Sequence, residues 1–471
     1  MSAPPAPPDA FERVLDARLV ASVAAAGILS LCGVVVETSM NIAFPALMAE
    51  FAVTTATVQW ITTGYLLVLA AIIPLSAYLK RRFRLKSLFT AALVLFLAGT
   101  LACIFAPSFP VLLAGRLVEG VGTGLTLPLM YNIVIDQAPR EKMGLMMGVA
   151  TLVTAIGPAA GPVLGGFIVD TWGWRAIFMA LVPLLAVSLV MGVATMRQPY
   201  PTRRVSFSVP QFATLAASFA CLLFAANAAS TAGWLSARTL ALLAAFAVLL
   251  ALFCLLALRS DDPLIDVRMF RIAGFSLSVA YVVLLQATAL ATSYIIPNYA
   301  QLSFGYGALA AGCLMLPGCV TGALLAPFGG RLLDALGAKR PIVFGAVSQL
   351  AALSLLAALS TRVPVIWLAI FNIFISISQG FSMSNSITNG LSFLPLERTA
   401  DGNAAMNTLQ QLGGALGTAV ATSIVSAAQT GAADMAAATA LGAAQAFHVF
   451  LLVSIAALLL TCLKFLPKHV S

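Results

Sequence analysis

The sequence predicts an all-α polytopic membrane protein with about fourteen transmembrane helices. Of the 471 residues, 61% are hydrophobic and only 9% are charged. The hydrophobic residues form runs of about 20 that end at charged residues, prolines or glycines. A soluble chain of this length needs far more charge to cover its surface, whereas apolar side chains can face lipid directly. Because a backbone in lipid must satisfy its own hydrogen bonds, each run is expected to be helical.

The expected spans follow one another along the chain between two short tails. The tails, residues 1–18 and 467–471, are expected to lie in the cytosol. Each span is long enough to cross the hydrocarbon core of a bilayer. In order, the spans are placed at 19–46, 58–79, 87–106, 109–132, 143–169, 174–196, 209–228, 237–258, 273–300, 308–334, 341–359, 363–394, 402–427 and 443–466.

Basic residues collect in alternate connections between these spans. The connections after the even-numbered spans and the two tails hold most of the 25 Lys and Arg residues, while the other connections keep Arg175, Arg238 and Arg362. Because positive residues remain on the cytoplasmic side during insertion, this alternation predicts an even number of spans with both termini cytoplasmic. The net charge of +9 is therefore an insertion signal, and nucleic acid is not expected as a partner.

An internal repeat divides the chain into two halves. The segment from Pro74 to Lys86, after the second span, is similar to the segment from Pro327 to Lys339, after the tenth. Two such halves can rock against each other around a central site, as the halves of secondary transporters do. The repeat predicts three segments, namely an N-terminal six-helix bundle at 19–196, a linker with two extra transmembrane helices at 197–272 and a C-terminal six-helix bundle at 273–466.

Metal and enzyme chemistry have little support in the sequence. The seven cysteines lie inside apolar runs, and the two histidines, His448 and His469, are too few for a zinc or haem site. No metal, cofactor or disulfide is therefore expected. The acidic group of Asp261, Asp262 and Asp266 is better interpreted as a solvated linker than as the carboxylate cluster of a membrane enzyme, so no enzymatic activity is predicted.

Five segments carry the motifs of one known family. They are Glu37–Pro45, Gly115–Gly124, Gly157–Gly166, Gly330–Arg340 and Met406–Gly417. In these residues the chain resembles the major facilitator superfamily, and within it the fourteen-helix branch of drug:proton antiporters, which includes multidrug and lincomycin-resistance-like efflux transporters. The resemblance implies the major facilitator fold, with two pseudo-symmetric six-helix bundles plus two inserted helices. It also implies a multi-pass location in the bacterial inner (cytoplasmic) membrane.

The resemblance assigns roles to two of these motifs, and the chain departs from the family at two places. The first-half copy of the gate loop lies within Pro74–Lys86. There Arg81 stands at the position that is acidic in the family and Arg84 at the position of its second glycine, so an asymmetric gate is expected. Glu119 stands where the branch commonly has glutamine, which adds a titratable group. The implied residues are Gly157, Pro158, Gly161, Pro162, Gly165 and Gly166 for an antiporter motif, and Gly330, Arg331, Asp334, Gly337, Lys339 and Arg340 for a cytoplasmic gate.

Three ionisable residues lie well inside expected spans. A charge in hydrocarbon is costly, so such groups usually line a cavity or pair with one another. Glu37 in the first span and Arg116 and Glu119 in the fourth are expected at similar depth, and the latter two share a helical face because they are three residues apart. We expect Glu37 and Glu119 to exchange protons, the coupling ion, while Arg116 favours their ionised forms. The alternative is a buried ion pair that only fixes the packing of helices.

The fifth span has a stripe of glycines at 157, 161 and 165, which recur every four residues. Such a stripe gives a smooth face that another helix can approach closely, and Pro158 and Pro162 remove backbone donors. The functional interpretation is a sealed interface between the two halves that limits proton leak. The alternative is ordinary packing of small residues.

Aromatic and amide side chains in the spans are candidates for a mostly apolar substrate cavity. Each could instead form a hydrogen bond between helices. The predicted function is a proton-coupled exporter of small amphipathic compounds or drugs by alternating access, and the alternative is a permease or exporter of a specific metabolite or osmolyte. A functional monomer is expected in the lipid bilayer, with a periplasmic adaptor and an outer-membrane channel as candidate partners. The candidate substrate-binding residues are Asn41, Tyr65, Tyr131, Gln286, Tyr294, Asn298, Asn372, Gln379, Asn385, Asn407 and Gln411.

Overall fold

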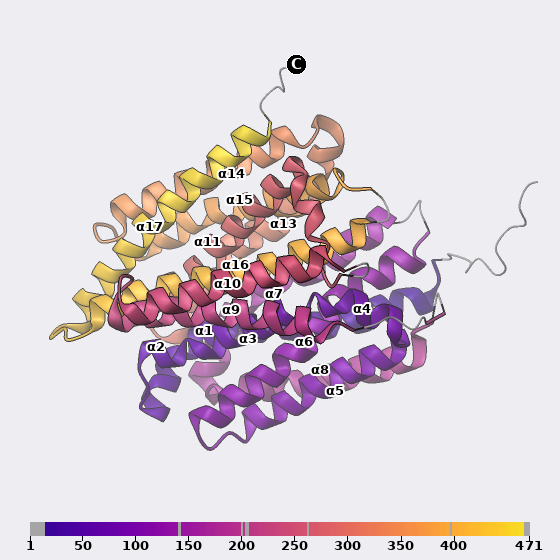
Figure 1. The fold of residues 1–471 in the computed structure, drawn as a ribbon. Helices are drawn as coiled ribbons and strands as arrows, with labels where there is room; N and C mark the ends of the chain where they lie inside the picture. The colour runs from indigo at the N-terminus through magenta and orange to yellow at the C-terminus, as the bar shows by residue number, and fades with distance from the viewer. Residues whose placement is uncertain are drawn as a thin grey trace, which may run out of the picture.

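The computed structural model describes residues 15–139, 143–198, 201–202, 207–260, 263–395 and 398–465. In these ranges the chain forms helices and no strand. Figure 1 shows the helices running side by side along one direction, as expected for a polytopic membrane protein. A large cluster of buried apolar side chains, including Leu29, Phe44, Phe89, Phe371 and Phe447, extends through both halves of the chain.

The first half of the chain forms one group of helices, drawn from indigo to magenta in Figure 1. One of its spans deviates from a single rod at two places, because α2 and α3 meet at Gln59 and Pro74 separates α3 from α4. Proline cannot donate a backbone hydrogen bond, which explains the second break. The first half comprises α1 (Ala17–Phe51), α2 (Thr55–Val58), α3 (Trp60–Ile72), α4 (Leu75–Arg82), α5 (Leu85–Ile104), α6 (Phe109–Gln137), α7 (Met143–Trp172) and α8 (Arg175–Thr195).

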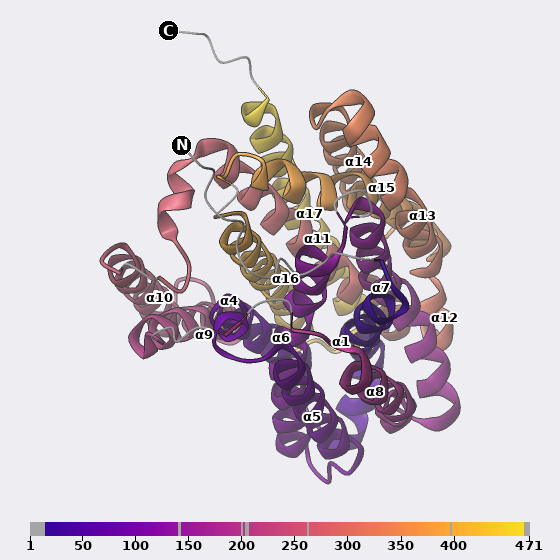
Figure 2. The same cartoon turned by 90° about the vertical axis from the view of Figure 1, so that its right-hand side faces the viewer.

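The second half forms another group, drawn from salmon through orange to yellow in Figure 1. Two further helices, α9 (Val209–Ala232) and α10 (Ala237–Leu258), lie outside both groups in Figure 2. Helix α9 packs on α3 and α16, and α10 packs on α9 and is outermost. The short helix η2 (Val267–Arg271) then leads into α11. The second half comprises α11 (Ala273–Phe304), α12 (Ala308–Cys313), α13 (Leu316–Leu336), α14 (Lys339–Leu359), α15 (Ile366–Leu391), α16 (Thr399–Gln429) and α17 (Met435–Lys464).

The expected spans agree closely with these helices. Thirteen helical stretches of the described chain are long and apolar enough to cross a membrane. Helix α7 occupies the remaining expected position, 143–169, and packs along α1. The predicted all-α polytopic class is therefore confirmed.

The last helix begins earlier than predicted, at Met435 instead of residue 443. The Asp434 side chain accepts hydrogen bonds from the backbone N–H groups of Ala436 and Ala437 and so caps the helix. The alanine-rich first turns are less hydrophobic than the rest of the span, which is why a search for apolar runs missed them.

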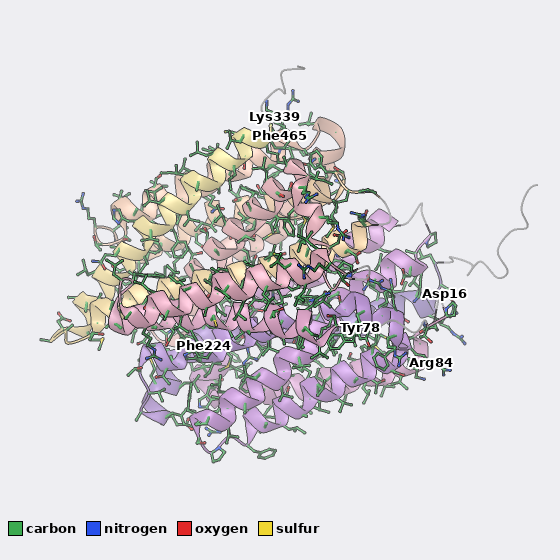
Figure 3. All side chains as sticks on the ribbon, viewed as in Figure 1. Asp16, Tyr78, Arg84, Phe224, Lys339 and Phe465 are labelled. Carbon is green, nitrogen blue, oxygen red and sulfur yellow. The ribbon has the colours of Figure 1, made fainter. Side chains whose placement is uncertain are left out.

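The two ends of the helices differ in charge. We call one end the basic end, where the connections near Arg84, Arg197 and Arg398 lie; Figure 3 shows Asp16 and Arg84 there. Asp16 is paired with Arg197 at 2.6 Å, and Arg398 with Asp266 at 3.0 Å. The opposite end carries the connections from α1 to α2, from α7 to α8 and from α11 to α12.

Candidate functional site

Glycines on α6 let two neighbouring helices approach it closely. A Cβ atom on Gly115 would lie 2.7 Å from Cys103 Sγ on α5, and one on Gly120 would lie 3.1 Å from the Tyr65 carbonyl oxygen on α3. Gly122 and Gly124 repeat the pattern further along the helix, toward α5 and α3 respectively. Close contact on both sides of α6 encloses the residues between these glycines.

Arg116 and Glu119 form an ion pair in this enclosed position. Arg116 Nη1 lies 2.6 Å from Glu119 Oε2, and neither side chain is exposed. The hydroxyl of Thr100 on α5 donates to Glu119 Oε1 at 2.7 Å. Both carboxylate oxygens of Glu119 therefore have a hydrogen-bond donor.

Tyr65 holds the guanidinium from the other side. The Tyr65 ring centroid lies 4.2 Å from Arg116 Cζ, which is a cation–π contact. Its hydroxyl lies 2.8 Å from Thr123 Oγ1 and 3.2 Å from the carbonyl oxygen of Gly33 on α1. Two donors of Arg116, Nε and Nη2, are buried and have no hydrogen-bond partner among the described residues.

Glu37 on α1 is the third ionisable group of this region. Its side chain is 5% exposed, and the described chain offers it neither a hydrogen bond nor an ion pair. Glu37 thus keeps a small exposed fraction, whereas Glu119 keeps none. Arg116 is the cation that acts on it electrostatically. The structure thus places the three predicted residues together among α1, α3, α5 and α6, with Glu119 fully paired and Glu37 unpaired.

The glycine stripe of α7 packs on α1, within the first half. Ser39 Oγ donates to the Gly161 carbonyl oxygen at 2.7 Å, and a Cβ on Gly165 would lie 2.7 Å from Ser39 Cβ. Gly157 meets Val34 in the same way. The prediction that the stripe seals the two halves against each other is therefore wrong. Sequence spacing shows that a face is smooth but does not identify the helix that covers it.

Other residues of the same motif do meet the second half. A Cβ on Gly166 would lie 2.7 Å from Leu309 Cα on α12, and Gly312 packs against the Pro162 carbonyl oxygen. The side chain of Pro158 lies outside the described part of the chain.

Hydrogen bonds join the two halves at the opposite end. Asn298 Nδ2 donates to the Asn41 carbonyl oxygen at 3.3 Å, and Thr55 Oγ1 donates to Gln429 Oε1 at 3.1 Å. The Asp170 carboxylate on α7 accepts the backbone N–H groups of residues 308 and 309 at the start of α12, at 3.2 and 2.7 Å. These contacts hold the halves together at this end.

A different contact lies at the basic end. Arg81 on α4 is 3.9 Å from Asp401 in the first turn of α16, and Lys80 is 2.7 Å from Asp136 on α6. Arg81 stands at the position where the family's gate loop has an acid, so the sign of the charge is reversed and its carboxylate partner comes from the second half.

The second-half gate loop is built around a glycine turn. Gly337 has φ of 75°, which favours glycine, and it ends α13 before Lys339 and Arg340 begin α14. Arg331 lies over the Phe328 ring at 5.9 Å, and a Cβ on Gly330 would meet nothing within 4 Å. The side chain of Asp334 lies outside the described residues, so the charge contacts of the gate stay a prediction.

The candidate substrate-binding residues are spread over both halves. Most of them form hydrogen bonds to another helix or within their own helix. Asn385 Nδ2 donates to the carbonyl oxygens of Gly329 and Phe381, both at 2.8 Å, and Gln379 donates to that of Leu285 at 3.2 Å. Tyr294 is buried and packs against Phe44 with ring centroids 6.0 Å apart; its hydroxyl makes no hydrogen bond of regular geometry in the described chain, although the Thr422 side chain acts on it.

The remaining candidates have weaker or partly exposed environments. Asn41 accepts a hydrogen bond from Thr62, and Gln286 accepts one from Gln410 at 3.4 Å. Asn407 donates to Asn403 on its own helix, and Asn372 lies 3.9 Å from Met315 Sδ. Tyr131 and Gln411 are half-buried. Their role in binding substrate stays a prediction.

Sequence reasoning missed Thr100, Thr123 and Asp170. The first two complete the surroundings of the ion pair, and the third joins α7 to α12. A faint signal existed for Thr100, because Gly99 before it allows the approach of α6: a Cβ there would lie 2.6 Å from the Gly115 carbonyl oxygen.

Comparison with known proteins gives a consistent result. A family model described as the Major Facilitator Superfamily matches residues 26–418. The lincomycin resistance protein LmrB of Listeria monocytogenes is 34% identical over 418 residues, covering 89% of this chain and 88% of that protein. A multidrug resistance protein B homolog of Mycobacterium tuberculosis is 26% identical over 414 residues, covering 86% of this chain and 76% of its own length. Among solved structures, the human organic anion transporter MFSD10 is similar with a TM-score of 0.64 at 16% identity, covering 94% of this chain and 99% of that one.

Proposed function

Because the chain belongs to the Major Facilitator Superfamily, we propose that it is a secondary transporter that exports small amphipathic compounds, including antibiotics, in exchange for protons. The names of its relatives, lincomycin resistance and multidrug resistance proteins, support export of drugs. The observation that carries the proton-coupling part is the unpaired carboxylate of Glu37 beside the Arg116–Glu119 ion pair. A charge in the hydrophobic interior is costly, so its presence there indicates a functional site.

In this proposal Glu37, Arg116 and Glu119 form the coupling site. When the basic end is open, Glu37 releases its proton and a substrate binds. When the opposite end is open, the substrate leaves and a proton returns to the Glu37 carboxylate. The second state requires the contacts of Asn298 with Asn41, and of Asp170 with the start of α12, to break.

The proposed location is the bacterial inner membrane, with the basic end and both termini on the cytoplasmic side. The alternation of basic residues along the chain supports this orientation. Small amphipathic substrates and the bilayer are the proposed partners of a functional monomer, and a periplasmic adaptor with an outer-membrane channel would complete export from a cell with two membranes.

A permease for a specific metabolite or osmolyte is the second candidate, and it differs in its dependence on Glu37. An enzyme is not supported, since the family and its named relatives are transporters. Asp266 accepts from the backbone N–H of Arg268 and pairs with Arg398, which is a structural role. Asp261 and Asp262 lie outside the described residues.

Everted vesicles from a host that lacks its own drug pumps test the proposal. Lincomycin and the fluorescent cation ethidium serve as probes, and a pH-sensitive dye reports substrate-driven proton movement. Glu37→Gln keeps the size of the side chain but cannot lose a proton, so we expect both proton movement and export against a gradient to fall to background.

Glu50→Gln on the same helix is the matched control. Glu50 is bound to Trp174 Nε1 at 2.6 Å and to Arg175 Nη1 at 2.7 Å at the opposite end, so we expect this variant to retain coupled export. Full activity of Glu37→Gln, or equal loss in both variants, would contradict the assignment.

A further inference from the structure

The two acidic residues of the coupling site have unequal surroundings. Glu119 has a donor on each oxygen, Thr100 on one and Arg116 on the other, and no exposed surface. Glu37 has no hydrogen-bond or ion-pair partner in the described chain and keeps accessible surface. A proton can reach Glu37 without changing a bond between side chains, whereas protonation of Glu119 must either reverse its bond with Thr100 or remove the acceptor of Arg116.

The geometry at Thr100 favours an ionised Glu119. The hydroxyl hydrogen of Thr100 has two acceptors in reach, the Phe96 carbonyl oxygen at 2.9 Å and Glu119 Oε1 at 2.7 Å. A carboxylate accepts the stronger, charge-assisted bond, so the hydroxyl turns to Glu119 while that group is ionised. A proton on Oε1 would turn the Thr100 hydroxyl hydrogen to Phe96 and replace the charge-assisted bond by a neutral one, and a proton on Oε2 would oppose Arg116 Nη1 at 2.6 Å.

Burial disfavours a charge on Glu119, and Arg116 and Thr100 oppose this effect. The titratable groups that act on it or surround it are Cys32 and Glu37 from α1, Tyr65 from α3, Cys103 from α5 and Arg116 on its own helix. Arg116 is the one cation among these described groups. If Glu119 were neutral, Arg116 would lose its ion-pair partner while fully buried, which is costly.

We propose that Thr100 is a positioning residue that keeps Glu119 a permanent anion, so that Glu37 alone carries the exchanged proton and one proton moves in each transport cycle. Arg116 and Glu119 cancel each other, which leaves Glu37 as the group whose protonation makes the site neutral. The proposal rests on the proposed function for its transport meaning, but the protonation states themselves can be measured without a substrate.

The close packing of α5 on α6 explains why Thr100 can do this. A Cβ on the neighbouring Gly99 would lie 2.7 Å from Glu119 Cγ and 2.6 Å from the Gly115 carbonyl oxygen. This approach sets the Thr100 hydroxyl at hydrogen-bond distance from a side chain on another helix. Thr126 is a useful contrast, because among the described residues its buried hydroxyl bonds only the Gly122 carbonyl oxygen of its own helix.

Infrared difference spectroscopy of the purified protein in lipid, between acidic and neutral pH, tests the proposal. The carbonyl band of protonated carboxyl groups reports which acids take up a proton. We expect Glu37→Gln to remove one component of the wild-type difference band and Glu119→Gln to remove none. A component that disappears in Glu119→Gln would overturn the proposal, even if no Thr100 variant could be purified.

Variants of Thr100 test its own role. Thr100→Val has nearly the same shape without the hydroxyl, and we expect it to add a carboxyl component that is absent from the Thr100→Val/Glu119→Gln double variant. Thr100→Ser restores a hydroxyl and should match the wild type, as should Thr126→Val. A Thr100→Val spectrum equal to that of the wild type would contradict the positioning role.

Transport measurements then separate this proposal from the proposed function. In vesicles with ethidium as probe, we expect the export of Thr100→Val to depend more steeply on pH than that of the wild type, because two acids then titrate. Normal export by Glu37→Gln would refute the proposed proton coupling. The protonation state of Glu119 is tested by the infrared spectra alone and does not depend on that result.

Discussion

The two halves share a helical architecture but differ in the chemistry of their interiors. The first half keeps Glu37, Arg116 and Glu119 well inside its helices. In the described part of the second half, Asp401 and Lys464 lie near the basic ends of α16 and α17, and the buried polar groups of the middle turns are amides and hydroxyls such as Asn372 and Asn385. This difference agrees with the proposal that places the proton-coupling residues in the first half.

The difference also changes what a substitution costs. A buried ion pair leaves an uncompensated charge when one partner is removed, whereas a buried amide leaves at most a few unpaired dipoles. Comparable substitutions in the two halves should therefore differ in both stability and transport.

The largest expected effect comes from breaking the ion pair of the first half. Arg116→Met removes the cation and leaves Glu119 buried with only Thr100 as a side-chain donor. We expect a loss of about 3–5 kcal/mol in the free energy of unfolding, measured by unfolding in detergent. Arg116→Met/Glu119→Gln, which removes both charges, should recover a large part of this loss.

Asn385→Leu is the comparison in the second half. It removes two hydrogen bonds of 2.8 Å to backbone carbonyl oxygens, and its expected cost is about 1 kcal/mol, since polar contacts between membrane helices contribute little on average. Equal costs for Asn385→Leu and Arg116→Met would remove the energetic distinction between the halves.

The contrast between the halves could be predicted only in part from the sequence. Charged residues in apolar runs are visible without a structure, and the spacing of Arg116 and Glu119 already placed them on one face of a helix. The helix that covers a given face was not predictable, as the glycine stripe at 157, 161 and 165 shows. That stripe meets α1 rather than the second half.

Residues that act through a single hydrogen bond were harder still to predict. Thr100 is an ordinary polar residue in an apolar run, and most threonine hydroxyls in these helices bond a carbonyl of their own helix, as Thr126 does. Its contact with Glu119 depends on how closely α5 approaches α6, which is a property of the folded protein. The second and tenth expected spans are each broken near a proline, at Pro74 and Pro317 respectively.

A pair of tyrosines provides a test of intermediate size. Tyr65 and Tyr294 are both buried, but the Tyr65 hydroxyl is bound to Thr123 while the Tyr294 hydroxyl makes no hydrogen bond of regular geometry among the described residues. Tyr65→Phe keeps the ring over Arg116 and should cost about 1 kcal/mol through the lost hydrogen bond. Tyr294→Phe removes a buried hydroxyl that lacks such a bond and should leave stability unchanged or raise it. Unfolding midpoints of the two variants measure the difference, and a larger loss in Tyr294→Phe would show that its hydroxyl binds a group such as a buried water.

The smallest expected effect concerns the ends of the two halves, where the charges are exposed. Asp16 caps α1 by accepting from the Leu19 N–H at 2.8 Å and pairs with Arg197 at 2.6 Å. The hydrogen bond from the Leu19 N–H contributes most to holding the pKa of Asp16 below its ordinary value, and the charge and hydrogen bond of Arg197 act in the same direction. A carboxyl group whose pKa is lowered on folding stabilises the protein above its unfolded pKa of about 3.9, and this contribution is lost as the pH falls through the folded pKa.

Asp16→Asn therefore tests whether this peripheral charge stabilises the first half. Asparagine still caps a helix but carries no charge, so the unfolding midpoint should fall slightly at neutral pH, and the difference from wild type should vanish in acid. Asp434→Asn is the matched change in the second half, because Asp434 caps α17 and has no ion-pair partner in the described chain. A difference that persists in acid would mean that Asp16 acts through its shape instead of its charge. In that case the first half would owe none of its stability to the ion pair between Asp16 and Arg197.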